Sequence, residues 1–89
     1  MKKLFLCSLC HNGVLGGALY LDVQAVTYRT QKLTVDQKYR ELVLPLQEIE
    51  SLTWKTVLAI FRMKSGEEYR LLIFNKPRFE KWYRAYGGN

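Results

Sequence analysis

The last third of the chain changes its periodicity from that of a strand to that of a helix, and this change limits what the chain can fold into. Residues 69–74 are a short run of apolar and β-favouring side chains, bounded by a Ser-Gly pair before it and by a proline at position 77 after it. The next segment carries four aromatic residues at i, i+3, i+4 and i+7, which places their rings on one helical stripe: Phe79, Trp82, Tyr83 and Tyr86. We therefore expect a strand followed by a helix over about 76–86.

The expected helix has recognisable ends but cannot be stable alone. Asn75 is a residue type that caps helix starts, Pro77 suits a first turn, and Gly87 with Gly88 can end the last turn. A helix of about three turns is marginal in water by itself. Its four aromatic rings are therefore expected to belong to the core, where they close a sheet or barrel made by the preceding residues.

Those preceding residues read as short strands separated by turn residues. Apolar or alternating segments lie at 4–10, 18–21, 24–29, 42–46, 49–54 and 57–64, ahead of the one at 69–74. The first is apolar on both faces, so its strand is expected to be central or partly covered by the helix. Pro45 cannot donate a hydrogen bond to a ladder, which predicts that its strand lies at a sheet edge or ends at this residue. Residues 30–40 are the most polar stretch and are expected to form a loop.

Seven closely spaced strands followed by one amphipathic helix define the predicted fold class. We expect a mainly β (α+β) domain, in which an antiparallel barrel or sandwich with its strands within 4–74 is capped by the C-terminal helix. A chain of 89 residues is one domain with a modest core, and we expect residues 1–89 to form a single and complete unit.

Charge and cysteine content bear on compartment and partners. The net charge of +6 suits anionic partners, although the same charge serves solubility in a small domain. The N-terminal apolar run ends at residue 10, short of the roughly 18 residues that a membrane span needs, and no small-x-small cleavage site follows it. Two closely spaced cysteines do not make a disulfide framework. We expect the protein in the cytoplasm, either free or peripheral to the membrane.

Three segments together resemble the GRAM domain family. Residues 16–22 and 25–28 (GGALYLD and AVTY) are similar to its G-x-L-y-L-T … R-l-x-F hairpin, residues 44–49 (LPLQEI) to its I-P-L-x-x-I strand end, and residues 64–71 (KSGEEYRL) to its K-S-G-x-x-Y-x-F hairpin. GRAM domains belong to the pleckstrin-homology-like (PH-like) superfold, which has seven strands and a C-terminal helix. The resemblance implies this fold for residues 4–86.

The chain also departs from the family pattern. Asp22 stands where the family often has threonine, and Gln24 with Ala25 replaces an Asn-Arg type of pair. Many phosphoinositide-binding members of the superfold carry basic residues around the first hairpin, whereas residues 11–17 here contain neither lysine nor arginine. The resemblance therefore assigns no binding residue to this chain.

Basic residues elsewhere fall into two groups that are candidates for anionic-ligand contacts. One group belongs to the polar loop and its borders, and the other to the expected helix: Arg29, Lys32, Lys38 and Arg40, and Lys76, Arg78, Lys81 and Arg84. Each group could equally be a solvated outer face. If the two groups bind an anionic membrane surface, each basic residue close to that surface would strengthen binding by about 1 kcal/mol.

The segment Cys7-Ser8-Leu9-Cys10-His11 has the spacing of a c-type haem attachment site and supplies three zinc donors. Haem attachment takes place in an exported compartment, and the chain has no evident export signal. A zinc site within one chain lacks a fourth donor, so the remaining metal hypothesis is a zinc ion shared between subunits. The simplest interpretation is structural, with two small apolar side chains in a strand. We expect no cofactor and no resident metal.

No residue set in the sequence suggests catalysis. The chain has one histidine, and its only neighbouring nucleophile, Cys10, would point to the opposite face of a strand. We therefore expect a binding module rather than an enzyme. A protein partner or self-association is the first hypothesis, peripheral membrane targeting through anionic lipid is the second, and a nucleic-acid-binding small barrel is the third because the helix aromatics are expected to be buried.

Overall fold

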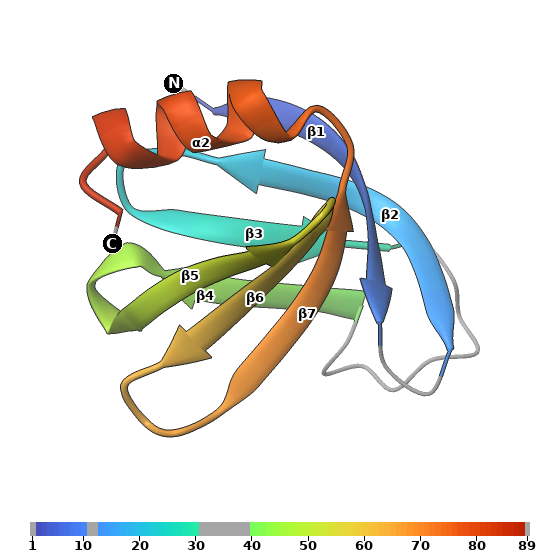
Figure 1. Ribbon diagram of the computed structural model, residues 1–89, viewed down its shortest axis with the longest axis horizontal. Coiled ribbons are helices and arrows are strands. Elements are labelled where there is room, and N and C mark those ends of the chain that lie inside the picture. Colours follow the sequence, from blue (N-terminus) through green and yellow to red (C-terminus); the bar gives the residue numbers. More distant parts are fainter. Residues whose placement is uncertain (1, 11–12, 31–39, 89) are drawn as a thin grey trace.

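The computed structural model describes residues 2–10, 13–30 and 40–88. These residues form one antiparallel sheet of seven strands and a C-terminal helix (Figure 1). The elements are β1 (Lys3–Cys10), β2 (Val14–Leu21), β3 (Ala25–Arg29), β4 (Glu41–Pro45), the short 3₁₀ turn η1 (Leu46–Glu48), β5 (Ile49–Lys55), β6 (Leu58–Met63), β7 (Glu68–Ile73) and α2 (Lys76–Ala85). The predicted mainly β fold, with seven antiparallel strands and a C-terminal helix, is confirmed. Most of the polar loop expected at 30–40 lies outside the described residues.

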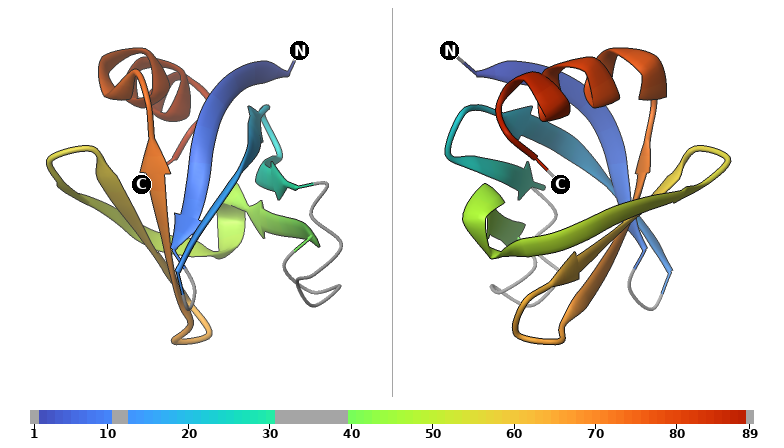
Figure 2. Two further views of the ribbon diagram at one scale, coloured as in Figure 1. Left: turned by 90° about the vertical axis from the view of Figure 1, so that its right-hand side faces the viewer. Right: turned by 60° about the vertical axis from the view of Figure 1, so that its left-hand side comes forward.

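The sheet brings the first and last strands together at its centre. The strand order is β4-β3-β2-β1-β7-β6-β5, so β1 lies between β2 and β7. Cys7 is opposite Gly17 on one side and opposite Ile73 on the other. The sheet curls into an open half-barrel, and α2 lies across one end of it (Figure 2). Pro45 is the last residue of β4 at a sheet edge, as its missing N–H predicts.

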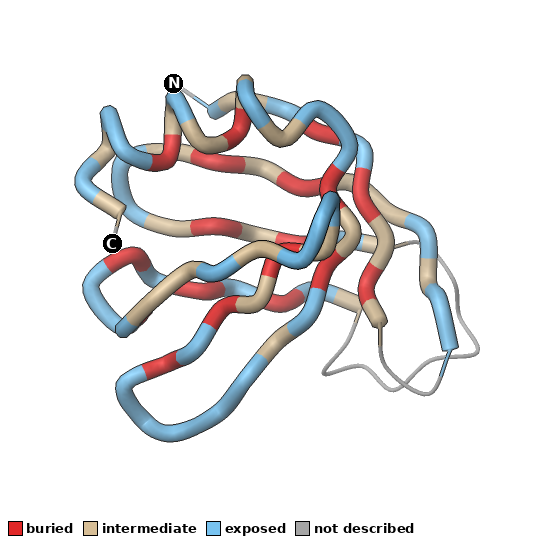
Figure 3. Tube along the Cα trace, viewed as in Figure 1, coloured by how far each residue is buried: buried red, intermediate tan, exposed pale blue. Residues whose placement is uncertain are grey.

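Side chains alternate between the inside and the outside of the curled sheet. The buried residues on β1 are Phe5, Cys7 and Leu9, and the same alternation runs along β2, β3 and β4 (Figure 3). This inner face is the hydrophobic core, with no buried charged residue among the described ones. Because β1 is also apolar on its outer face, leucine side chains there are left at the surface.

The aromatic stripe of α2 is only partly committed to the core. Phe79 and Tyr83 are buried and their rings stack with centroids 5.7 Å apart. Phe79 also meets Phe5 edge-on at 5.1 Å. Trp82 and Tyr86 pack against each other at 5.7 Å and remain half-buried at the border of the core. The expectation that all four rings are buried is therefore right for two of them. The face of α2 that contacts the sheet includes Phe79 and Tyr83, whereas Trp82 and Tyr86 lie at its border.

The two ends of α2 are formed in different ways. Asn75 precedes the helix in a left-handed conformation with φ 68°, and its side chain makes no capping hydrogen bond. The C-terminus has the expected glycine ending: the N–H of Gly88 donates to the carbonyl of Tyr83 at 2.8 Å, and the N–H of Gly87 donates to that of Arg84 at 3.1 Å. This pair of bonds is a Schellman motif, and Gly87 supplies the positive φ of 91° that it requires. No helix among the described residues combines the length and the apolar character needed to cross a membrane.

Candidate binding surface

The outer face of β1 carries large apolar side chains that the described residues do not cover. Leu6 is 69% exposed, and Leu4 and Phe74 are each 53% exposed. Leu6 is directly opposite Ala18 on β2, and the N–H of Phe74 donates to the carbonyl of Leu6 at 3.2 Å on the other side. These side chains are therefore neighbours across three adjacent segments. We call Leu4, Leu6, Ala18 and Phe74 the Leu6 patch.

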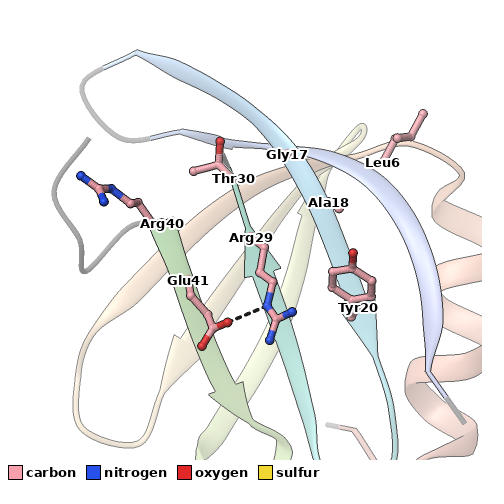
Figure 4. Close-up of a pocket in the computed structure, with 8 residues that line it drawn as sticks. All are labelled: Leu6, Gly17, Ala18, Tyr20, Arg29, Thr30, Arg40 and Glu41. Atoms are coloured by element: carbon pink, nitrogen blue, oxygen red, sulfur yellow. Dashed lines mark ion pairs between the residues drawn. The ribbon is translucent and has the colours of Figure 1, made fainter. Parts of the chain in front are cut away.

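Two hollows border the Leu6 patch. The larger has a volume of about 740 Å³ and opens over β2, where small residues leave space on the sheet (Figure 4); it is lined by Leu6, Gly17, Ala18, Tyr20, Arg29, Thr30, Arg40 and Glu41. The smaller has a volume of about 220 Å³ and is lined by Leu4, Phe5, Leu6, Phe74, Asn75 and Arg78. Leu6 stands between the two hollows and lines both.

Of the loop group, the structure places Arg29 and Arg40 at the larger hollow. The Nε of Arg29 lies 2.6 Å from Oε2 of Glu41, and both side chains are about half exposed. Such an exposed pair adds only about 0–1 kcal/mol to stability, but it offsets much of the charge of Arg29. The Arg29 guanidinium also lies 5.8 Å from the centre of the Tyr20 ring, and the Nζ of Lys2 lies 5.9 Å from the same ring centre. Lys32 and Lys38 lie outside the described residues.

The helix group does not form a single patch. Arg78 turns toward β1, where it donates to the carbonyl of Leu4 at 3.0 Å and lies 4.5 Å from the centre of the Phe5 ring. The remaining three contact other parts of the structure: Lys76 lies 5.1 Å from the Trp54 ring centre, Lys81 lies 5.6 Å from that of Trp82, and Arg84 lies 3.8 Å from Glu80. The structure therefore brings Arg29, Arg40 and Arg78 to opposite sides of the Leu6 patch, and leaves Lys76, Lys81 and Arg84 away from it.

The two cysteines lie on opposite faces of β1. Cys7 is buried in the core, whereas Cys10 is half-buried and three residues further along the strand. Burial raises the pKa of the Cys7 thiol to about 12, so it stays protonated at neutral pH. Among the described residues, no three His, Cys, Asp or Glu side chains gather in a way that could hold a metal ion. His11 lies outside the described residues, but the strand alone prevents both thiols from reaching one ion or one haem.

Sequence reasoning identified three of the cations around this surface but not its apolar centre. The signal for Leu4 and Leu6 was present, since residues 4–10 are apolar on both faces. That pattern predicts a strand that is central or partly covered by the helix. The strand is central, as predicted, and it has one face in the core and the other face open.

Among known proteins, this chain is similar in fold to a solved structure and has no match by sequence. The chain matches no protein-family model and no curated protein. It is similar to a solved structure, the C-terminal domain of an unknown protein from Leishmania infantum, with a TM-score of 0.73 and 9% sequence identity over 94% of this chain and 81% of that one. At this identity the likeness extends to the fold alone.

Proposed function

We propose that the chain is a non-catalytic binding module of the PH-like, GRAM-type class, and that it holds a protein partner or a second copy of itself on the Leu6 patch. The observation that carries this proposal is the exposure of Leu4, Leu6 and Phe74 side by side on the outer face of the sheet. Contiguous apolar side chains on a surface generally mark an interaction site, since leaving them in water is unfavourable. The PH-like assignment is supported by the strand count, the terminal helix and the motif resemblance.

Site-specific photo-crosslinking in the source cell tests this proposal. A photoreactive amino acid at position 6 is expected to give protein adducts, because a partner would lie directly over that side chain. The matched control is position 23, since Val23 is 60% exposed but lies in the turn between β2 and β3. Equal labelling at both positions, or no adduct at position 6, would contradict the proposal. Mass spectrometry of the adduct then identifies the partner as this chain or as another protein.

A second candidate function is docking on an anionic membrane. It is favoured by one observation, namely that Arg78 borders the smaller hollow beside Leu4 and Phe74, so a cation and insertable apolar groups share one corner. Apolar groups can enter the interfacial region of a bilayer while arginine contacts lipid phosphate.

Flotation with neutral and anionic vesicles at physiological salt tests membrane docking. If docking occurs, the protein floats only with anionic vesicles, and both Leu6→Ser and Arg78→Gln reduce the bound fraction several-fold. Lys81→Gln is the matched control, since Lys81 is exposed on α2 away from the Leu6 patch. Absence of binding at physiological salt would remove the membrane candidate and leave the protein-binding proposal.

A further inference from the structure

We propose that the Leu6 patch is a self-recognition surface, which pairs two copies of this chain face to face about a twofold axis running along the strands between β1 and β2. This inference rests on the proposed function and names its partner. It follows from how large and small side chains are ordered across the outer face of the sheet.

The decisive feature is one row of side chains that crosses four adjacent segments. Leu6 is opposite Ala18, Ala18 is opposite Arg29, and the N–H of Phe74 bonds to the Leu6 carbonyl. The row therefore runs Phe74, Leu6, Ala18, Arg29. Its bulky apolar members lie on one side of the gap between β1 and β2, and its smallest member lies on the other side. The protruding Leu6 thus stands beside a hollow whose floor contains Gly17 and Ala18.

A twofold axis along that gap makes the row complementary to itself. Such an axis exchanges β1 of one copy with β2 of the other, so Leu6 of each copy lies over Ala18 of the other. Each protruding side chain then enters the hollow of the opposite copy. The same operation places Phe74 over Arg29 of the second copy, where a guanidinium can lie against an aromatic face.

The neighbouring rows agree with the same axis. Leu4 is opposite Tyr20 on β2, so the axis places Leu4 over the Tyr20 ring of the second copy. On the other side of the Leu6 row, Ser8 is opposite Gly16, and two small residues would meet there. Under this axis a large residue meets a small one in the Leu6 row, an apolar residue meets an aromatic one in the Leu4 row, and two small residues meet in the Ser8 row.

The charges around the patch do not single out an acidic protein as the partner. The centre of the patch carries no charge, and Arg29 is already paired with Glu41 within its own chain. Arg78 is already hydrogen-bonded to the carbonyl of Leu4 and lies against the Phe5 ring. Two copies of a chain with net charge +6 still repel each other, so self-association should strengthen as salt rises. Binding to an acidic partner should weaken under the same change.

Analytical ultracentrifugation over a range of concentrations and salt tests the pairing. The wild-type chain is expected to dimerise, more tightly at 300 mM than at 30 mM salt. Leu6→Ser and Ala18→Arg are each expected to raise the dimer Kd at least about a hundredfold, because each change is present twice in a symmetric interface. Val23→Ser removes an exposed side chain outside the patch and should leave the Kd unchanged. Circular dichroism checks that each variant remains folded.

The position of the axis is tested separately by chemical crosslinking. Phe74→Cys and Arg29→Cys proteins, each in a Cys10→Ser background, are mixed and treated with a short bis-maleimide. The facing residues would be about 10 Å apart across the stacked sheets, whereas like positions would be about 17 Å apart. Crosslinks are therefore expected in the mixture and not in either protein alone.

The dimer and the proposed binding function are contradicted by different experimental results. A wild-type chain that stays monomeric at every concentration and salt overturns the dimer. If photo-crosslinking at position 6 then captures a different protein, the proposed function stands and only the identity of the partner is wrong. If position 6 gives no protein adduct either, both proposals fail. Dimerisation that persists in both Leu6→Ser and Ala18→Arg would place the interface elsewhere and also overturns the inference.

Discussion

Phe79→Ala is expected to lower the free energy of unfolding by about 3–5 kcal/mol, the largest effect of any single substitution in α2. The Phe79 ring is fully buried and meets the rings of Phe5, Trp54 and Phe61 edge-on while stacking on Tyr83. Alanine would leave a cavity at the point where the helix joins both halves of the sheet. Because small domains are stable by only about 5–15 kcal/mol, the variant should unfold at much lower urea concentration. Urea titration followed by far-ultraviolet circular dichroism measures the difference.

Trp82→Ala is the matched comparison for this prediction. Trp82 belongs to the same aromatic stripe and is the larger side chain, but it is half-buried at the border of the core. Its removal should therefore cost clearly less than the removal of Phe79. Equal losses in the two variants would show that the docking of α2 onto the sheet differs from the one described.

Gly17→Ala is expected to destabilise the fold by about 1–3 kcal/mol, although it adds a single methyl group. A Cβ at this position would overlap the carbonyl oxygen of Arg29 on the neighbouring strand and would lie 2.8 Å from a carbon of the Tyr28 ring. Tyr28 is itself held in place, because its hydroxyl donates to the carbonyl of Leu15 at 2.8 Å. Relief of the overlap therefore requires β2 and β3 to separate. Thermal unfolding measures the loss.

Gly16→Ala provides a control one residue away. An added Cβ at Gly16 meets no atom within 4 Å, since this residue faces outward on the same strand. Its effect on stability should lie within about 0.5 kcal/mol. A comparable loss in both variants would mean that glycine is needed here for strand conformation rather than for the close approach at Gly17.

Much of the fold could be predicted because local chemistry and tertiary structure agree. Pro45 predicted an edge strand or the end of a strand, and the paired glycines at 87 and 88 predicted the end of α2; the structure bears out both predictions. The strands were predictable because buried and exposed side chains alternate along them. The start of α2 was less predictable, because Asn75 reaches it through a left-handed backbone rather than through a side-chain cap.

The candidate site could not be predicted because it depends on register and on what covers a face. The outward position of Leu6 follows from its alternation with Cys7, but its row with Ala18 and Arg29 requires the pairing of three strands. An apolar central strand is usually covered on both faces, and no local pattern shows that one cover is missing. The helix cations raise a similar difficulty. Arg78 lies beside β1, whereas Lys81, about one turn further along α2, is exposed to solvent. Only the orientation of α2 on the sheet decides which of the two residues contacts β1.

The placement of β1 beside β7 has a consequence for how the chain is synthesised. These strands come from opposite ends of the chain, so the centre of the sheet cannot close until β7 has left the ribosome. Strands β1, β2 and β3 can pair earlier as hairpins, but one edge of β1 stays open during that time. Closing so distant a contact is entropically slow, and an open strand edge is a template for pairing with another chain. Protection from misassembly therefore comes only after the other strands, when β7 and the helix that covers the core have been synthesised.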